Sequence, residues 1–132
     1  MKYNKYKHMK IRIKGNSIRY RLTKTEVETF CKVGFYEERT EFRDQSFKYV
    51  LQSKENISHL EADFKNGTIS MYLPEQDKKE WANSERVGFQ HSSSIGNGTE
   101  LHLLLEKDFV CLDETGEDQS DNYPNPLMGK KE

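Results

Sequence analysis

The sequence has few cysteines and no long apolar run. No stretch approaches the roughly 18 consecutive apolar residues of a transmembrane helix, so we expect no membrane span. Residues 1–14 alternate charged and hydrophobic residues and lack the apolar core of a signal peptide, which favours a cytoplasmic protein. The two cysteines, Cys31 and Cys111, have neither CxxC nor CxxH spacing, and we predict that both are reduced and packed as small hydrophobic side chains.

The common motifs of phosphate-binding and hydrolytic sites are missing as well. The sequence has no Gly-rich phosphate loop, no G-x-S-x-G elbow and no H-E-x-x-H pair. The histidines lack the mutual spacing of zinc ligands; they are His8, His59, His91 and His102. We therefore predict no cofactor and no catalytic residue.

Acidic residues are missing from one end of the chain and basic residues from a segment near the other. The formal net charge is −1, but residues 1–25 contain no acid. Residues 113–123 contain no base, and we predict that residues 113–132 form an acidic, flexible tail. The acids in its first part, residues 113–123, are Asp113, Glu114, Glu117, Asp118 and Asp121. This uneven distribution of charge along the chain favours oriented electrostatic contacts, either within the chain or with a partner.

Hydrophobic residues alternate along several short segments, which predicts half-buried strands. In the first half, Thr23 followed by Glu26 is typical of a capping box, and Gly34 is typical of a helix end. In the second half, Asn66-Gly67 indicates a hairpin and Pro74 the start of a helix. The predicted strands are 10–14, 18–22, 35–42, 47–51, 58–64, 69–73, 87–91 and 101–112, and the predicted helices are 24–33 and 75–83.

The two halves repeat one plan. Adding 51 to a core position of the first half gives an apolar position of the second, whereas outward residues do not match. Chance alternation of hydrophobic residues is the alternative explanation. The matched pairs, all expected to point inward, are Ile11 and Ala62, Ile13 and Phe64, Ile18 and Ile69, Tyr20 and Met71, Leu22 and Leu73, and Phe30 and Trp81.

We therefore predict a mainly β (α+β) fold with about eight strands and two short helices. A duplicated strand–strand–helix–strand–strand unit would form a pseudo-two-fold barrel, because packing preserves core positions while surfaces diverge. The first repeat would cover residues 9–52 and the second 57–112, within a single domain that spans 1–112.

The first hairpin and the helix after it carry a resemblance. The run Gly15-Asn16-Ser17-Ile18-Arg19-Tyr20-Arg21-Leu22-Thr23 resembles the "G-N-S-x-x-V-R-I-P" opening of AbrB/MazE-type antitoxins, and residues 66–74 repeat it with the proline. In that superfamily two chains interlock as a dimeric swapped-hairpin barrel. The resemblance implies that this chain is like such a dimer fused into one polypeptide. It departs after the helices, where the Gly-Asp turn of the family is missing.

A second resemblance covers three separate segments. Residues 9–22, residues 106–112 and the Tyr-Pro-Asn-Pro run at 123–126 resemble a family of small bacterial proteins of unknown function. This resemblance implies no activity.

Basic and polar residues gather on the outward side of the first hairpin. We call this set the basic face: Lys10, Arg12, Lys14, Asn16, Ser17, Arg19 and Arg21. The AbrB/MazE resemblance implies DNA contacts at Lys14, Asn16, Ser17 and Arg21. The second hairpin, however, has Glu61, Asp63, Ser70 and Tyr72 at the positions of Lys10, Arg12, Arg19 and Arg21. Because a dimeric DNA binder presents two equivalent basic faces, a solvated face that pairs with the chain's own acids is favoured.

Acidic residues offer two candidate sites. The tail could hold a hard cation or dock on a basic partner, although its order does not fit an EF-hand loop. Glu61, Asp63 and Glu106 could hold a metal for phosphate chemistry if they faced a barrel interior. Charge pairs facing water are favoured over catalysis, because the opposite side of the strand is apolar.

These observations favour a non-enzymatic binding module for a macromolecular partner. We expect that partner to be a protein of unknown identity. The alternatives are an AbrB/MazE-like DNA-binding regulator and a metal-dependent enzyme that acts on a phosphorylated substrate. We expect a monomer or a weak dimer.

Overall fold

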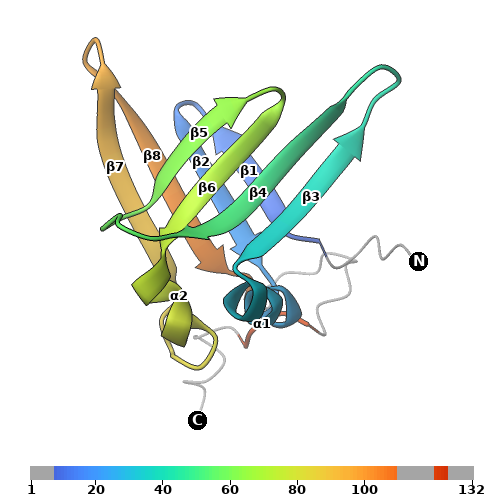
Figure 1. The fold of residues 1–132 in the computed structure, drawn as a ribbon, viewed down its shortest axis with the longest axis vertical. Coiled ribbons are helices and arrows are strands. Elements are labelled where there is room, and N and C mark those ends of the chain that lie inside the picture. The colour runs from blue at the N-terminus through green and yellow to red at the C-terminus, as the bar shows by residue number, and fades with distance from the viewer. Residues whose placement is uncertain (1–7, 110–120, 125–132) are drawn as a thin grey trace.

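A computed structural model describes residues 8–109 and 121–124 (Figure 1). It contains eight strands and two helices, as predicted, and its class is mainly β. In chain order they are β1 (Lys10–Lys14), β2 (Ser17–Leu22), α1 (Lys24–Val33), β3 (Phe35–Glu41), β4 (Ser46–Lys54), β5 (Glu61–Lys65), β6 (Thr68–Pro74), α2 (Glu75–Trp81), β7 (Gly88–Gly96) and β8 (Thr99–Lys107).

The strands form two four-stranded sheets that exchange hairpins between the halves of the chain. One sheet has the order β1-β2-β8-β7 and the other β3-β4-β6-β5. Each sheet therefore combines the first hairpin of one half with the second hairpin of the other. The two hairpins meet through a parallel pair, β2 with β8 and β4 with β6.

The strand register repeats along with the order. Lys10 pairs with Arg21 in the first hairpin, and Glu61 pairs with Tyr72, each 51 positions later. In the parallel pairs, Tyr20 faces Leu105 and Met71 faces Leu51. A slip of one residue would turn every side chain to the opposite face, so the shared register preserves the same inward positions in both halves.

The two sheets pack against each other but do not join into a closed barrel. They converge at the end covered by α1 and α2 and spread apart toward the four hairpin turns (Figure 1). Side chains, rather than strand pairing, hold the edges together near the helices. Tyr49 donates to the carbonyl of Met9 at 2.7 Å on one seam, and the rings of His59 and His91 stack at 3.7 Å on the other.

The core confirms the inward positions near the helices and corrects two near the turns. Tyr20, Met71, Leu22, Leu73, Phe30 and Trp81 are all at most 1% exposed. Ile13 and Phe64, predicted to point inward, are instead 56% and 65% exposed. The reason is the spread of the sheets, because it leaves a cleft between these side chains that is open to solvent near the turns.

Several boundaries also differ from the prediction. The strand predicted at 58–64 begins only at Glu61. Residues 92–94, which lie between the strands predicted at 87–91 and 101–112, belong to β7 and pair with β8. A polar edge strand resembles a loop in sequence, since its neighbour supplies the hydrogen bonds and its side chains face water. Helix α2 ends at Trp81, two residues earlier than predicted.

Candidate binding surface

Strand register places the charged members of the basic face together. Arg12 pairs with Arg19 and Lys10 with Arg21 across β1 and β2, on the side of the sheet opposite the buried Tyr20 and Leu22. Like charges opposite one another on a sheet repel and are destabilising. Nearby acids are therefore expected to stabilise this arrangement.

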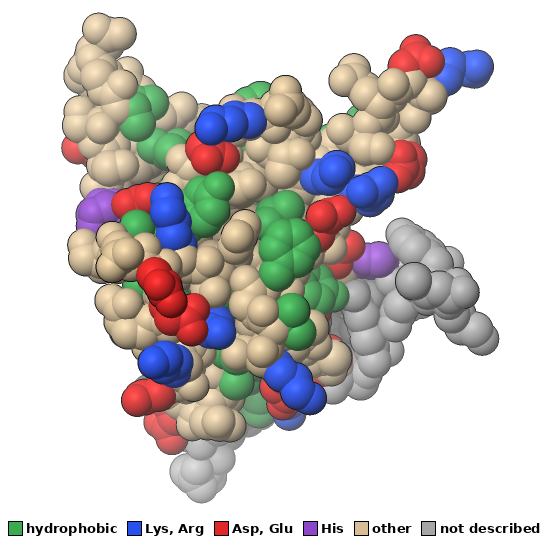
Figure 2. Space-filling view, in the orientation of Figure 1, with side chains coloured by type: hydrophobic (Ala, Val, Ile, Leu, Met, Phe, Trp, Pro, Cys, Tyr) green, Lys and Arg blue, Asp and Glu red, His purple; other side chains and the backbone are tan. Residues whose placement is uncertain are grey.

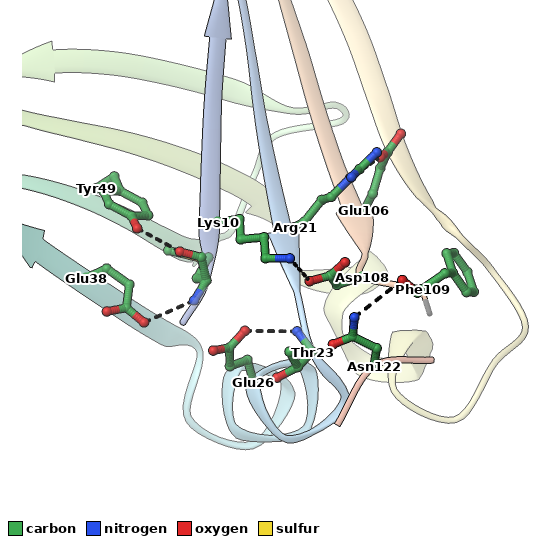
Figure 3. A network of polar contacts seen from close by, with 11 residues as sticks. Lys10, Arg21, Thr23, Glu26, Glu38, Tyr49, Glu106, Asp108, Phe109 and Asn122 are labelled. Atoms are coloured by element: carbon green, nitrogen blue, oxygen red, sulfur yellow. Dashed lines mark hydrogen bonds and ion pairs between the residues drawn. The ribbon is translucent and has the colours of Figure 1, made fainter. Parts of the chain in front are cut away.

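Three of the five cations have such acids. Glu106, on β8, lies 3.6 Å from Arg19 and 3.4 Å from Arg21. Asp108, which is 4% exposed, lies 3.1 Å from the ammonium of Lys10 (Figure 3). Part of the positive charge of the basic face is therefore neutralised within the chain.

Arg12 and Lys14 differ from the other cations. Both are exposed, and neither has an ion-pair partner within residues 8–109 and 121–124. The neighbouring turn is held instead by Asn16, whose amide donates to the carbonyl of Glu100 at 2.7 Å. The free positive charge of the face is thus concentrated toward the turn of the first hairpin.

The outer surface of this sheet is hollowed beside these cations. A hollow of about 260 Å³ is lined by Arg12, Lys14, Ser17, Arg19 and Leu104. Leu104 also lines a second hollow of about 520 Å³, together with Gln90, His91, Ser92, His102 and Leu103. The two hollows therefore adjoin, and one wall is cationic while the other offers polar hydrogen-bonding groups.

The outer surface of the other sheet has a different charge pattern. Arg39 lies 3.3 Å from Glu37 and 3.2 Å from Glu41, and Lys54 lies 3.6 Å from Glu61. Figure 2, which looks onto this sheet, shows acidic and basic side chains beside one another. This surface therefore carries paired charges of both signs and lacks the excess of cations of the basic face.

The three acids of the predicted metal site do not come together. Glu61 and Asp63 lie on β5, in one sheet, and Glu106 lies on β8, in the other. Asp63 accepts a hydrogen bond from the hydroxyl of Tyr72 at 3.2 Å, and Glu106 pairs with arginines. Within the described part of the chain, no group of three or more His, Cys, Asp or Glu residues could hold a metal ion.

Asp121 is the one acid of the predicted tail that the structure describes; Asp113, Glu114, Glu117 and Asp118 lie outside the described residues. Its carboxylate accepts a hydrogen bond from the hydroxyl of Thr25 at 2.9 Å, and its carbonyl accepts one from the backbone of Lys24 at 2.9 Å. A carboxylate at the first turn of α1 is favourable because the helix dipole is positive there. In contrast to the predicted flexible tail, residues 121–124 are thus bound to the body.

A buried carboxyl lies next to this segment. Glu26 is 2% exposed and accepts a hydrogen bond from the backbone of Thr23 at 2.8 Å, as the predicted capping box requires (Figure 3). Burial raises the pKa of Glu26 to about 7, although the hydrogen bonds from Thr23 oppose the rise. The spacing of Thr23 and Glu26 predicted the capping box, but nothing in the local sequence indicated that β3 and the 121–124 segment would cover the carboxyl.

The arrangement defines a duplicated two-sheet β protein with one cationic, hollowed outer face. No helix in the described residues is long and apolar enough to cross a membrane. Residues 9–127 match the model of a family of unknown function (DUF7009), and the chain belongs to that family. Searches of the curated proteins and of the solved structures gave no match.

Proposed function

We propose that this chain is a non-enzymatic binding module of the cytoplasm whose basic face takes an acidic segment of a protein partner. The observation that carries the proposal is the pair of exposed cations, Arg12 and Lys14, beside a hollow of about 260 Å³. Neither cation pairs with an acid in the part of the chain that the structure describes, so both can meet an acidic ligand. The polar wall around Gln90 and His102 would hydrogen-bond the partner's backbone or polar side chains.

The described features favour a protein over a nucleic acid as partner. Nucleic-acid affinity grows with the number of phosphates that cations neutralise, and three of the five cations are paired with acids within the described residues. Single strands also need exposed aromatic rings for stacking, and Tyr20 of β2 points into the core. An acidic peptide needs neither many phosphate contacts nor a stacking platform.

An AbrB/MazE-like DNA-binding regulator is the second candidate, and the exchange of hairpins between the two halves favours it. In that superfamily the same exchange occurs between two chains. The second hairpin of this chain weighs against it, since Glu61 and Asp63 replace two of its cations. Binding would then be one-sided rather than symmetric.

A competition between two polyanions tests the proposal. Fluorescence anisotropy would follow a labelled poly-glutamate peptide and a labelled DNA duplex, each titrated with the full chain at low and physiological salt. We expect the peptide to bind and Arg12→Glu with Lys14→Glu to weaken binding by at least about tenfold, which corresponds to 1.4 kcal/mol. The matched control is Lys48→Glu with Lys65→Glu, which changes the charge equally on the other sheet and leaves binding unchanged.

Two results contradict the proposal. If the duplex binds more tightly than the peptide, the DNA-binding candidate replaces it. If both double variants weaken peptide binding equally, net charge rather than the basic face is responsible.

A further inference from the structure

The end of the molecule farthest from the helices is unusually apolar. Four of the large hydrophobic side chains that are exposed lie there, one at each hairpin turn: Ile13, Phe42, Phe64 and Ile95, between 56% and 65% exposed. Exposed apolar surface gathered at one end of a molecule commonly marks a protein interface. We call these four residues, with the cleft between them, the apolar rim.

The cleft at the centre of the apolar rim is formed by both sheets. It has a volume of about 360 Å³, and its lining is apolar apart from Asp63. The lining residues are Ile13, Ile18, Phe47, Ala62, Asp63, Phe64, Ile69 and Leu101. A small ligand in this cleft would cover Ile13 and Phe64 but would leave Phe42 and Ile95 exposed, because neither lines the cleft.

The apolar rim follows the internal pseudo-symmetry. Ile13 and Phe64 occupy equivalent register positions on β1 and β5, where they pair with Ile18 and Ile69. Phe42 and Ile95 likewise lie at the equivalent turns after β3 and at the end of β7. A surface built in pairs around a two-fold axis can meet the same surface of another copy in an isologous contact, in which each pair contacts its counterpart.

Charge at this end also suits a second copy. The four turns, with the two residues on either side of each, carry three cations and three anions. The cations are Lys14, Arg43 and Lys65, and the anions are Glu41, Asp44 and Glu100. A neutral surface of mixed sign does not repel itself, whereas a strongly acidic or basic partner would gain nothing from it.

We propose that the apolar rim is a dimerisation surface at which two copies of this chain meet end to end, with their pseudo-two-fold axes aligned. The contact buries the four hydrophobic residues of each copy and closes the cleft. Lys14 of the basic face lies beside this contact, whereas Lys10, Arg12, Arg19 and Arg21 lie farther along β1 and β2 on the outer side of the sheet, so the dimer does not rest on the function proposed above.

Sedimentation velocity of the full chain, from low to high micromolar concentration, tests the proposal. We expect a concentration-dependent dimer whose Kd rises at least about tenfold in Phe64→Asp, because dimerisation would then bury a carboxylate in an apolar contact. Phe42→Asp, on a turn, is a second variant that cannot disturb the core and should have the same effect. The matched control is Val33→Asp, since Val33 is 64% exposed on α1 at the opposite end.

Each other outcome overturns the proposal. If the wild-type chain stays monomeric throughout this concentration range, the proposed dimer does not form. A dimer that Phe64→Asp and Phe42→Asp leave intact, or that Val33→Asp weakens equally, places the contact elsewhere. A monomer that binds the hydrophobic dye ANS in a manner sensitive to Phe64→Asp would identify the cleft as a small-molecule site instead.

Discussion

The two halves of this chain have nearly the same interior and very different surroundings. Phe30 of the first half and Trp81 of the second are both at most 1% exposed, and each lies on the helix that closes its half. Outside the core the halves diverge. The helix of the first half begins with a capping box, and the glutamate of this box, Glu26, is buried. In contrast, α2 follows Pro74 and has no side-chain cap.

The seams between the sheets diverge in the same way. His8 lies 3.2 Å from the carboxylate of Glu38 on one seam, and His59 stacks on His91 on the other. One seam thus has a contact between a histidine and a carboxylate, and the other has two stacked histidine rings. Close packing preserves volume and shape at core positions, while polar positions at seams and caps can change without loss of the fold. The predictions below test how far this equivalence extends.

The largest effect is expected in the shared core. Phe30→Ala and Trp81→Ala each remove a fully buried ring, which costs about 3–5 kcal/mol of the free energy of unfolding. If the halves are equivalent in packing, the two losses should agree within about 1 kcal/mol. Urea unfolding followed by circular dichroism measures both, and Val33→Ala on the surface of α1 is the control, with less than about 0.5 kcal/mol expected. A loss confined to one half would mean that the other folds around a looser core.

The next effect concerns the buried carboxyl, which only the first half has. Burial raises the pKa of Glu26 from 4.5 to about 7, so the folded state holds a proton that the unfolded state releases. Stability from this group is therefore complete below about pH 4.5 and is lost as the pH rises to about 7, by roughly 3 kcal/mol. Glu26→Gln should flatten this part of the dependence of Tm on pH.

The matched control is Asp77→Asn at the equivalent position of α2, which lies 51 residues later and is not buried. It should leave the pH dependence of the wild type unchanged. If Asp77→Asn flattens the curve as much as Glu26→Gln does, the dependence belongs to the overall charge of the molecule.

Sequence reasoning predicted the elements and the duplication, because both depend on local patterns. Alternation gave the strands, Thr23 with Glu26 gave the start of α1, and the offset of 51 gave the repeated register that the structure shows. It failed for Ile13 and Phe64, since alternation indicates which side of a strand is apolar but not whether a second sheet covers it. The spread of the sheets is a tertiary feature with no local signal.

The candidate site was predicted in part for the same reason. The basic residues of β1 and β2 were evident from the sequence, whereas their partners Glu106 and Asp108 come from the far end of the chain. Only the parallel pairing of β2 with β8 brings them together. The alternative of a metal site fails because Glu61 and Glu106 belong to different sheets, as a result of the hairpin exchange.

The smallest effect concerns the seams, because only one of them has a ring stack. The rings of His59 and His91 stack at 3.7 Å on this seam, whereas the other seam has the contact of His8 with Glu38. Aromatic ring pairs contribute about 0.5–1.5 kcal/mol beyond the area that they bury, so we expect His91→Ala to lower the free energy of unfolding by about 0.5–1 kcal/mol. Urea unfolding at a single pH measures the loss. His102→Ala, which removes an exposed histidine on the outer face of β8, should show less than half of this loss; an equal loss would mean that the ring stack contributes nothing specific to the seam.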